Sequence, residues 1–203
     1  MASQMDDPDP SSSAQSWAKA FADLRLWLTL AGFVAVLSVA WIAGSRLSGS
    51  ATEPQLQAGA KTGLIAPDFT LQTLDGKVMS LSAQRGNPVL INLWASWCGP
   101  CRSEMPAINN VYQKYRDTGF MVLAINATSQ DNENNARSFA RGQGVTFPVL
   151  LDRDGFTGGL YRLRSLPTSY FVGRDGVIRD VVVGAMSEAS LEARVKRLLA
   201  GDR

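Results

Sequence analysis

Two cysteines separated by two residues are the part of this sequence with the clearest capacity for chemistry. They lie in the segment Trp97-Cys98-Gly99-Pro100-Cys101, and the 203-residue chain has no other cysteine. This spacing, after an apolar strand and at the start of a helix, is typical of reversible thiol–disulfide chemistry. Free N–H groups and the helix dipole at that position would lower the pKa of the Cys98 thiol and favour a nucleophilic thiolate. Cys101, one turn later on the same face, could then attack a mixed disulfide on Cys98.

Two other roles for the cysteine pair have weaker physical support. A disulfide that closes so short a loop removes little entropy from the unfolded chain, so it would add little stability. A structural zinc site usually needs four cysteine or histidine ligands, and the chain has no histidine and no further cysteine. Only a zinc site shared between two chains would remain. We therefore expect no metal and no cofactor.

The overall composition excludes several other classes of protein. Hydrophobic residues make up 45% of the chain and charged residues 19%, which is ordinary for a folded protein and unlike a disordered one. The net charge is +2 and the basic residues form no stripe, so we expect no nucleic-acid partner. The absence of histidine excludes an imidazole base and a Ser-His triad.

The elements that must position the cysteines follow from the pattern of apolar residues. Residues 89–95 form a short, mostly apolar run, as in a buried central strand. Apolar and aromatic side chains recur at helical spacing after the motif and predict a helix over residues 100–118. These side chains are Ile108, Val111, Tyr112 and Tyr115.

Strands and helices alternate through the rest of the domain. We expect hairpins over residues 69–81 and 168–183. Further strands are predicted at residues 120–125 and 147–151, with a helix that ends near residues 142–144 and a last helix between Ser187 and Gly201. This order predicts an α/β domain with a central mixed sheet and helices on both faces.

The first 64 residues indicate a tail, an anchor and a tether. Residues 1–25 are polar and rich in small residues, as in a disordered tail, which we place in the cytoplasm. Residues 26–45 carry no charge, and twenty helical residues span about 30 Å, the thickness of a bilayer core. We predict one transmembrane helix there, an uncleaved signal anchor, with cleavage as a signal peptide as the alternative. Residues 46–64 are predicted as a flexible tether and residues 65–203 as the folded domain.

Several segments resemble those of one known family. They are APDFTL at 66–71, LDGK at 74–77, NLWASW at 92–97, CRSEMP at 101–106, FPVL at 147–150, LPT at 166–168 and GRDG at 173–176. With the cysteine motif, they resemble the membrane-anchored TlpA/ResA-like branch of the thioredoxin-like thiol–disulfide oxidoreductases. The resemblance covers nearly all of residues 65–200. It implies a thioredoxin-like fold with an N-terminal β-hairpin extension, preceded by one transmembrane helix.

The resemblance also implies an acid that handles protons. Thioredoxin has a buried acid six residues before its first cysteine, where this chain has Asn92, which cannot titrate. The TlpA/ResA-like branch instead has an acid at the position of Glu104. A buried Glu104 could take the proton of Cys101. The alternative is a solvated acid that the helix dipole favours.

Three further residues are implied to contact the substrate. Pro167 resembles the cis-proline that faces the cysteine motif in thioredoxin-like proteins, and Leu166 would present its backbone to an incoming substrate strand. Trp97 would shape the surface around the nucleophile. The expected catalytic residues are therefore Cys98, Cys101 and Glu104, and the expected substrate-binding residues are Trp97, Leu166 and Pro167.

The sequence favours a reducing enzyme over an oxidising one. The Gly99-Pro100 dipeptide matches that of thioredoxin, a reductant at about −270 mV, whereas the oxidant DsbA lies at about −120 mV because its reduced form is stabilised. No histidine is present to stabilise the Cys98 thiolate, and a nearby Glu104 would oppose it.

The biological setting is implied by the resemblance alone. It implies an extracytoplasmic protein-disulfide reductase that keeps the CxxCH cysteines of apocytochrome c reduced for haem attachment. Electrons would come from an integral membrane protein of the CcdA/DsbD type, and residues 26–45 would hold the domain at the periplasmic face of the membrane lipid. The alternatives are a peroxiredoxin-like thiol peroxidase, a periplasmic disulfide oxidoreductase with other substrates, and a membrane-bound module without catalysis.

Overall fold

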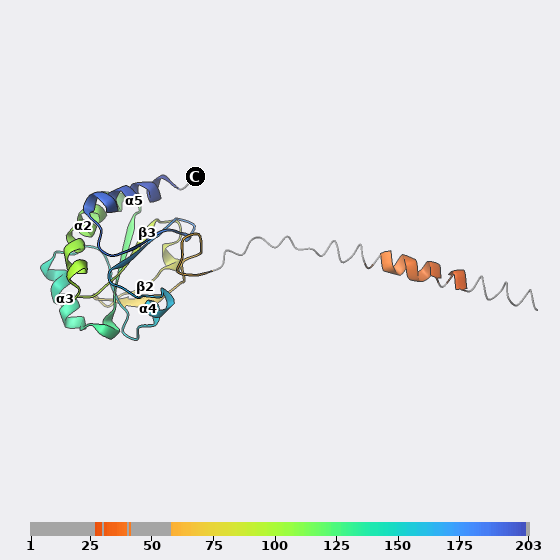
Figure 1. Cartoon of the computed structure of the whole chain (residues 1–203), viewed down its shortest axis with the longest axis horizontal. Helices are drawn as coiled ribbons and strands as arrows, with labels where there is room; N and C mark the ends of the chain where they lie inside the picture. Colours follow the sequence, from red (N-terminus) through yellow and green to blue (C-terminus); the bar gives the residue numbers. More distant parts are fainter. Residues whose placement is uncertain (1–26, 30, 40, 42–57, 202–203) are drawn as a thin grey trace, which may run out of the picture. The chain divides into compact units, whose positions relative to one another are not determined.

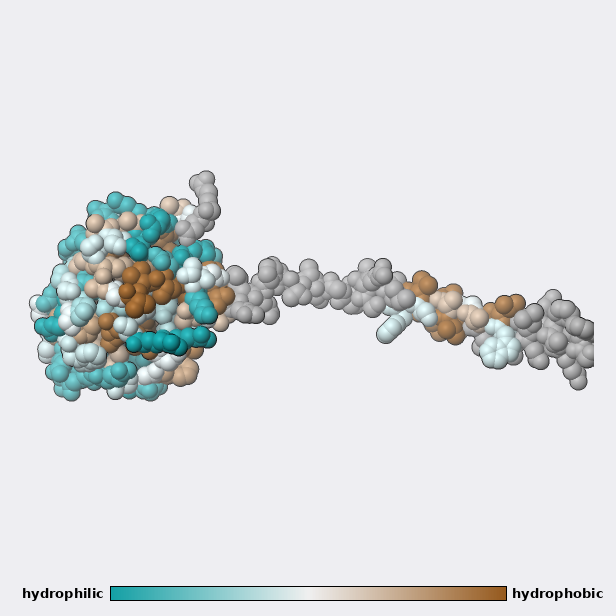
Figure 2. Space-filling view, in the orientation of Figure 1, coloured by the Kyte–Doolittle hydropathy of each residue, from teal (hydrophilic) through white to brown (hydrophobic). Residues whose placement is uncertain are grey.

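The computed structural model describes residues 27–29, 31–39, 41 and 58–201 (Figure 1). The chain divides into two compact units, Met1–Gln55 and Leu56–Arg203. The described residues of the first unit are helical, with exposed apolar side chains that are brown in Figure 2. Within the described residues, no helix combines the length and the apolar character needed to cross a membrane. The predicted span at 26–45 lies partly outside these residues, and the predicted tail at 1–25 lies wholly outside them.

The described part of the second unit is built on a seven-stranded mixed sheet with the order β2-β1-β5-β4-β3-β6-β7. Within the sheet, β3 (Val89–Trp94) pairs in parallel with β4 (Met121–Asn126) and antiparallel with β6 (Thr168–Val172). The predicted N-terminal hairpin and the predicted α/β class are both confirmed. The remaining strands are β1 (Thr70–Thr73), β2 (Val78–Ser80), β5 (Val149–Leu151) and β7 (Ile178–Val183).

The three longer helices of this unit cover the same face of the sheet (Figure 1). α2 (Gly99–Tyr115), α3 (Glu133–Gly142) and α5 (Glu188–Ala200) contribute to one hydrophobic cluster with Leu90 and Trp94 of β3. The connections β3-α2-β4 and β4-α3-β5 cross the sheet in the same direction, so right-handed crossovers place α2 and α3 on the same side.

The opposite face has a much smaller helical cover. It carries the short α4 (Phe156–Leu160), with the buried Tyr161 at its end, and the segment that leads into β1. Helices therefore lie on both faces, as predicted, but the helical cover of this face is much smaller. The sequence analysis does not predict α4, because Gly158 and Gly159 disfavour a helix. The buried carboxylate of Asp152 accepts hydrogen bonds from the backbone N–H groups of Thr157 and Gly158, and this stabilises the first turn.

The central strand places its side chains on alternate faces. All six residues of β3 are buried. Leu90 and Trp94 belong to the cluster that faces α2, whereas Ile91 and Leu93 belong to the cluster on the other face. Because side chains alternate along a strand, Asn92 shares the α2 face. A polar side chain therefore lies in the core against the helix that begins at the cysteines.

The ends of several elements differ slightly from the predictions. α2 stops at Tyr115, and the predicted final turn is the 3-10 helix η2 (Arg116–Thr118). For α5, the predicted N-cap Ser187 and the terminal Gly201 are confirmed. Two other single turns of 3-10 helix are η1 (Ser82–Gln84) and η3 (Thr128–Gln130).

Residues 58–64, which the sequence analysis assigns to the tether, form hydrogen bonds with the rest of the second unit. The backbone N–H of Gly59 donates to the carbonyl of Ile65 at 2.9 Å, and the N–H of Gly63 donates to the carbonyl of Ile178 at 2.8 Å. Ordered contacts with the sheet therefore begin before residue 65. The rest of the predicted tether, residues 46–57, lies outside the described residues.

Candidate active site

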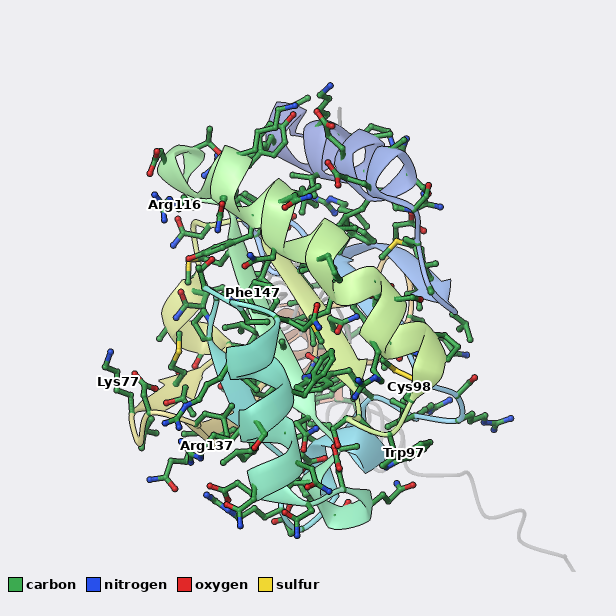
Figure 3. All side chains as sticks on the ribbon, turned by 90° about the vertical axis from the view of Figure 1, so that its left-hand side faces the viewer. Lys77, Trp97, Cys98, Arg116, Arg137 and Phe147 are labelled. Atoms are coloured by element: carbon green, nitrogen blue, oxygen red, sulfur yellow. A yellow bond between two sulfur atoms is a disulfide. The ribbon has the colours of Figure 1, made fainter. Side chains whose placement is uncertain are left out.

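The two cysteines form a disulfide at the N-terminus of α2 (Figure 3). Their Cα atoms are 5.2 Å apart, and Cys98 is the N-cap residue of the helix. The Cys98 sulfur accepts a hydrogen bond from the backbone N–H of Cys101 at 3.2 Å. Cys98 is 5% exposed, whereas Cys101 is fully buried. The second cysteine thus lies one turn deeper than the first, as the spacing predicts.

A carboxylate from another element fixes the loop before the cysteines. Asp131, directly after η3, accepts hydrogen bonds from the backbone N–H and the hydroxyl of Ser96, both at 2.6 Å. It also accepts from Nδ2 of Asn126 and from the backbone N–H of Asn132, both at 2.8 Å. Burial raises the pKa of Asp131, but the hydrogen bonds from Asn126 and Ser96 outweigh burial, and the pKa is lowered. A charged Asp131 therefore holds Ser96, two residues before Cys98.

Trp97 is the large exposed side chain beside the nucleophile, and Figure 3 shows it next to Cys98. It is 60% exposed, yet its indole Nε1 donates to the carbonyl of Gln130 at 2.9 Å. The same loop thus contacts both residues that precede Cys98, through Asp131 and Gln130.

Glu104 is buried on the same helix as the cysteines. It is 2% exposed and lies one turn after Cys101, so both side chains share the face of α2 that packs on the sheet. Its Oε1 accepts from Asn92 Nδ2 at 2.8 Å, and its Oε2 accepts from the backbone N–H of Met186 at 3.1 Å. Burial raises the pKa of Glu104, and the hydrogen bonds from Met186 and Asn92 offset this only in part. The alternative of a solvated Glu104 is wrong.

Asn92 links Glu104 to the neighbouring strand. Its Nδ2 also donates to the hydroxyl of Ser169, in β6, at 2.9 Å. Its carbonyl Oδ1 and Nε1 of Trp94 are the two buried side-chain polar atoms without a hydrogen-bond partner within the described residues. The amide is therefore oriented as a donor toward Glu104, the orientation that suits an ionised carboxylate.

The loop before β6 completes the site opposite the cysteines. The Leu166–Pro167 peptide bond is cis, as the resemblance implies. Leu166 lines a hollow of about 350 Å³ together with Trp97 and Cys98. Within the described residues, neither the backbone N–H nor the carbonyl of Leu166 forms a hydrogen bond with another backbone group. An extended segment in the hollow could therefore pair with Leu166.

Of the six predicted site residues, Trp97, Cys98 and Leu166 line one hollow, and Pro167 follows Leu166 through the cis peptide bond. Cys101 and Glu104 lie buried on the helix that Cys98 caps. The structure also adds residues that sequence reasoning does not identify. The alternation of side chains along β3 could have placed Asn92 against α2. No local signal in the sequence connects Ser169, Met186, Gln130 or Asp131 with the cysteines, because they come from distant segments.

A second groove lies away from the cysteines. It has a volume of about 660 Å³, and its lining includes Lys77, Arg137 and Phe147. Figure 3 shows these three residues on the opposite side of the view from Cys98 and Trp97. Within the described residues, no cluster of three or more histidine, cysteine or acidic side chains could hold a metal ion. Cys98 lines the hollow of about 350 Å³ and not this groove.

The fold and the site together define a thioredoxin-like thiol–disulfide oxidoreductase. Residues 62–181 match the model of the AhpC/TSA family, and the chain belongs to that family. The thioredoxin-like protein YneN of Bacillus subtilis is 37% identical over 173 residues, which cover 85% of this chain and 98% of that protein. The thiol-disulfide oxidoreductase ResA of Bacillus thuringiensis is 33% identical over 133 residues, or 66% of this chain and 76% of ResA.

Solved structures support the same class. A secreted disulfide oxidoreductase of Mycobacterium tuberculosis, homologous to Escherichia coli DsbE, matches with a TM-score of 0.59 and 26% identity. The match covers 64% of this chain and 96% of that one. The resemblance drawn from the sequence segments is therefore confirmed, as is the thioredoxin-like fold.

Proposed function

We propose that this oxidoreductase is an extracytoplasmic protein-disulfide reductase that acts on the CxxCH disulfides of apocytochrome c during cytochrome c maturation. The observation that carries the reducing direction is the buried Glu104 one turn below the cysteines. A carboxylate in that position opposes a stable thiolate on Cys98, and the chain has no histidine to stabilise one. A less stable thiolate form favours the disulfide state of the enzyme, and so favours reduction of the substrate.

The reaction proceeds in two exchange steps. The Cys98 thiolate attacks one sulfur of the substrate disulfide, the substrate S–S bond breaks, and the departing substrate thiolate takes a proton from water. Glu104 then accepts the proton of the Cys101 thiol, and the Cys101 thiolate attacks the Cys98 sulfur. The mixed disulfide breaks, the second substrate thiolate is protonated, and a Cys98–Cys101 disulfide forms. The substrate gains two electrons, which the two cysteine sulfurs lose, and two protons. Water supplies one proton, and Cys101 supplies the other through Glu104, because Cys98 enters the reaction already deprotonated.

Exposure supports this division of roles between the cysteines. Cys98 retains some contact with solvent, whereas Cys101 has none, so a protein substrate can reach only the first sulfur. The hollow between Trp97 and Leu166 would hold the substrate segment, with the free backbone groups of Leu166 pairing with it as a short added strand. Pro167 ends the loop that faces the motif.

The setting of the reaction follows from the same proposal. The relatives include a protein described as secreted, and an oxidising compartment supplies disulfide substrates, so we place the domain outside the cytoplasm. Residues 26–45 would anchor it in the membrane, near an integral membrane thiol donor of the CcdA/DsbD type that returns two electrons to the disulfide. The tether would keep the domain close to both partners.

The test is to trap the substrate. Full-length protein with Cys101→Ser would form a mixed disulfide on Cys98 that cannot be resolved, and mass spectrometry would identify the attached protein. The matched control is Cys98→Ser, which should trap nothing. Trapped apocytochrome c, with reduction of a CxxCH peptide disulfide by the unsubstituted protein, is the expected result. A different set of trapped periplasmic proteins would instead indicate a general disulfide oxidoreductase, and rapid turnover of hydrogen peroxide would indicate a peroxidase.

A further inference from the structure

Two hollows flank Trp97 at the redox site. One, of about 350 Å³, lies between the cysteine motif and the loop before β6, and its lining includes Arg164. The other, of about 460 Å³, lies between the start of α2 and α3, and its lining includes Arg102. Trp97 lines both hollows and is held by its hydrogen bond to Gln130. A substrate segment that occupies both hollows would therefore cross Trp97.

The side chains that line the two hollows carry positive charge only. Among the described lining residues, Arg102 and Arg164 are the charged ones, and no acid is present. Nη1 of Arg102 donates to the carbonyl of Ser96 at 3.1 Å, and its guanidinium lies 4.6 Å from the ring centre of Phe139. The guanidinium of Arg102 therefore already interacts with other groups of the protein.

Arg164 is different, because within the described residues it forms no ion pair and no hydrogen bond through its side chain. By contrast, the guanidinium groups of Arg137 and Arg153 form ion pairs with the carboxylate of Glu133, at 3.0 and 2.9 Å. The carboxylate of Asp131, which follows the lining residue Gln130, already accepts four hydrogen bonds from Ser96, Asn126 and Asn132. A guanidinium with its donors free thus lines the same hollow as the nucleophile, and its planar fork matches a carboxylate.

We propose that the substrate segment of this enzyme carries an aspartate or glutamate within three residues of its target cysteine, and that Arg164 binds that carboxylate. The inference rests on the proposed function as a protein-disulfide reductase and narrows its substrate class. The hollow supplies an apolar wall from Leu163 and Leu166, an exposed aromatic surface from Trp97 and one cation. An acidic extended segment complements this charge, whereas a basic segment would be repelled.

The test uses the full-length reduced protein and a matched set of disulfide-containing peptides. The peptides are identical except for Glu, Gln or Lys at one position, moved in turn through the three residues on either side of a cysteine. We expect the second-order rate of reduction to fall from Glu to Gln to Lys at one or more positions, by about two- to fivefold at each change, as for an exposed ion pair. The preference should weaken as salt is added.

Substitutions of Arg164 then test whether this side chain causes the preference for the Glu peptide. Arg164→Gln should make the three peptides react at similar rates, and Arg164→Glu should favour the Lys peptide. The matched control is Arg174→Gln, since Arg174, in the β6–β7 turn, donates a hydrogen bond to the carbonyl of Gly86 and lines neither hollow. Its peptide preference should equal that of the unsubstituted protein.

Three results would overturn the inference. Equal rates for the three peptides with the unsubstituted protein would show that the enzyme does not prefer acidic substrates, although it would still be a reductase. An equal loss of rate for all three peptides in Arg164→Gln would show that Arg164 acts on the Cys98 thiolate and not on the substrate. If the unsubstituted protein reduced none of the peptides, the proposed reductase function would itself be wrong.

Discussion

Asn92 Nδ2, in the middle of β3, donates a hydrogen bond of 2.8 Å to Oε1 of Glu104, on α2. The amide stands where the resemblance places the buried acid of thioredoxin, and the acid of this chain lies on the facing helix, in contact with that amide. The amide donor lowers the pKa of Glu104 and partly offsets the effect of burial, which raises it. The neutral amide of Asn92 thus lowers the pKa of Glu104 without adding a second charge to the core.

The first prediction concerns the nucleophile. Reduced protein treated with limiting iodoacetamide near pH 7 should be modified at Cys98 well before Cys101, because Cys98 keeps a small exposed area, Cys101 has none, and Cys98 stands at the N-terminus of α2. Peptide mapping after short reaction times would measure the ratio. Faster modification of Cys101 would reverse the roles assigned to the two cysteines.

The second prediction concerns Glu104→Gln. Loss of the carboxylate that accepts the Cys101 proton should slow resolution of the mixed disulfide by about 10²–10⁴-fold at neutral pH. Part of this rate should return at high pH, where Cys101 ionises without help. The pKa of the Cys98 thiol should also fall, because a neighbouring negative charge is gone. Stopped-flow rates between pH 5 and 10 would check both effects, and an unchanged profile would leave Glu104 with a structural role only.

The third prediction concerns Asn92. Asn92→Ala removes one of the hydrogen bonds that lower the pKa of Glu104, so the pH at which Glu104 becomes an effective base should rise. The rising limb of the pH–rate profile should move to higher pH, while Glu104→Gln should lack that limb. The matched control is Ser169→Ala, which removes a partner of Asn92 but no contact with Glu104, and it should move the profile less.

The fourth prediction concerns Asp131→Ala. Removal of this carboxylate leaves the hydroxyl and N–H of Ser96 and the amide of Asn126 without their acceptor, which should cost about 2–4 kcal/mol of unfolding free energy at pH 7. Since the pKa of Asp131 is lowered in the folded state, its stabilisation is complete above the ordinary aspartate pKa of about 3.9. The stabilisation is lost as the pH falls through the lowered value.

Urea denaturation at several pH values would measure this difference. The cost of Asp131→Ala should shrink toward pH 3. Asp117→Ala, at a side chain that is 92% exposed, is the control and should change stability little at any pH. A loss of stability in Asp131→Ala that stays constant from pH 7 to pH 3 would contradict the role of the charge.

The fifth prediction concerns residues 26–45. A reporter enzyme that works only outside the cytoplasm should be active when it is fused after Arg203. The fusion protein should also stay in the membrane fraction after washing with salt. Deletion of residues 26–45 should release the domain. A fusion that is active only in the cytoplasm would contradict the orientation, and a mature protein that starts after Ser45 would favour a cleaved signal peptide.

The class of this protein could be determined from local sequence. The pair Cys98 and Cys101 defines its own geometry, because two residues between cysteines after a strand place both sulfurs at one helix end. The hairpin around Gly76 and the cap at Ser187 are likewise local, since a turn residue and a capping hydroxyl act on neighbours a few positions away.

The surroundings of the cysteines were decided by the tertiary structure. The contact of Asn92 with Glu104 depends on the packing of α2 on β3. The hydrogen bonds from Ser96 to Asp131 depend on the position of the loop that follows β4. α4 forms despite its glycines because the buried Asp152 caps it. These groups lie far apart along the chain or oppose local propensity, so only the folded sheet brings together the partners that set the charge of Glu104 and the position of Cys98.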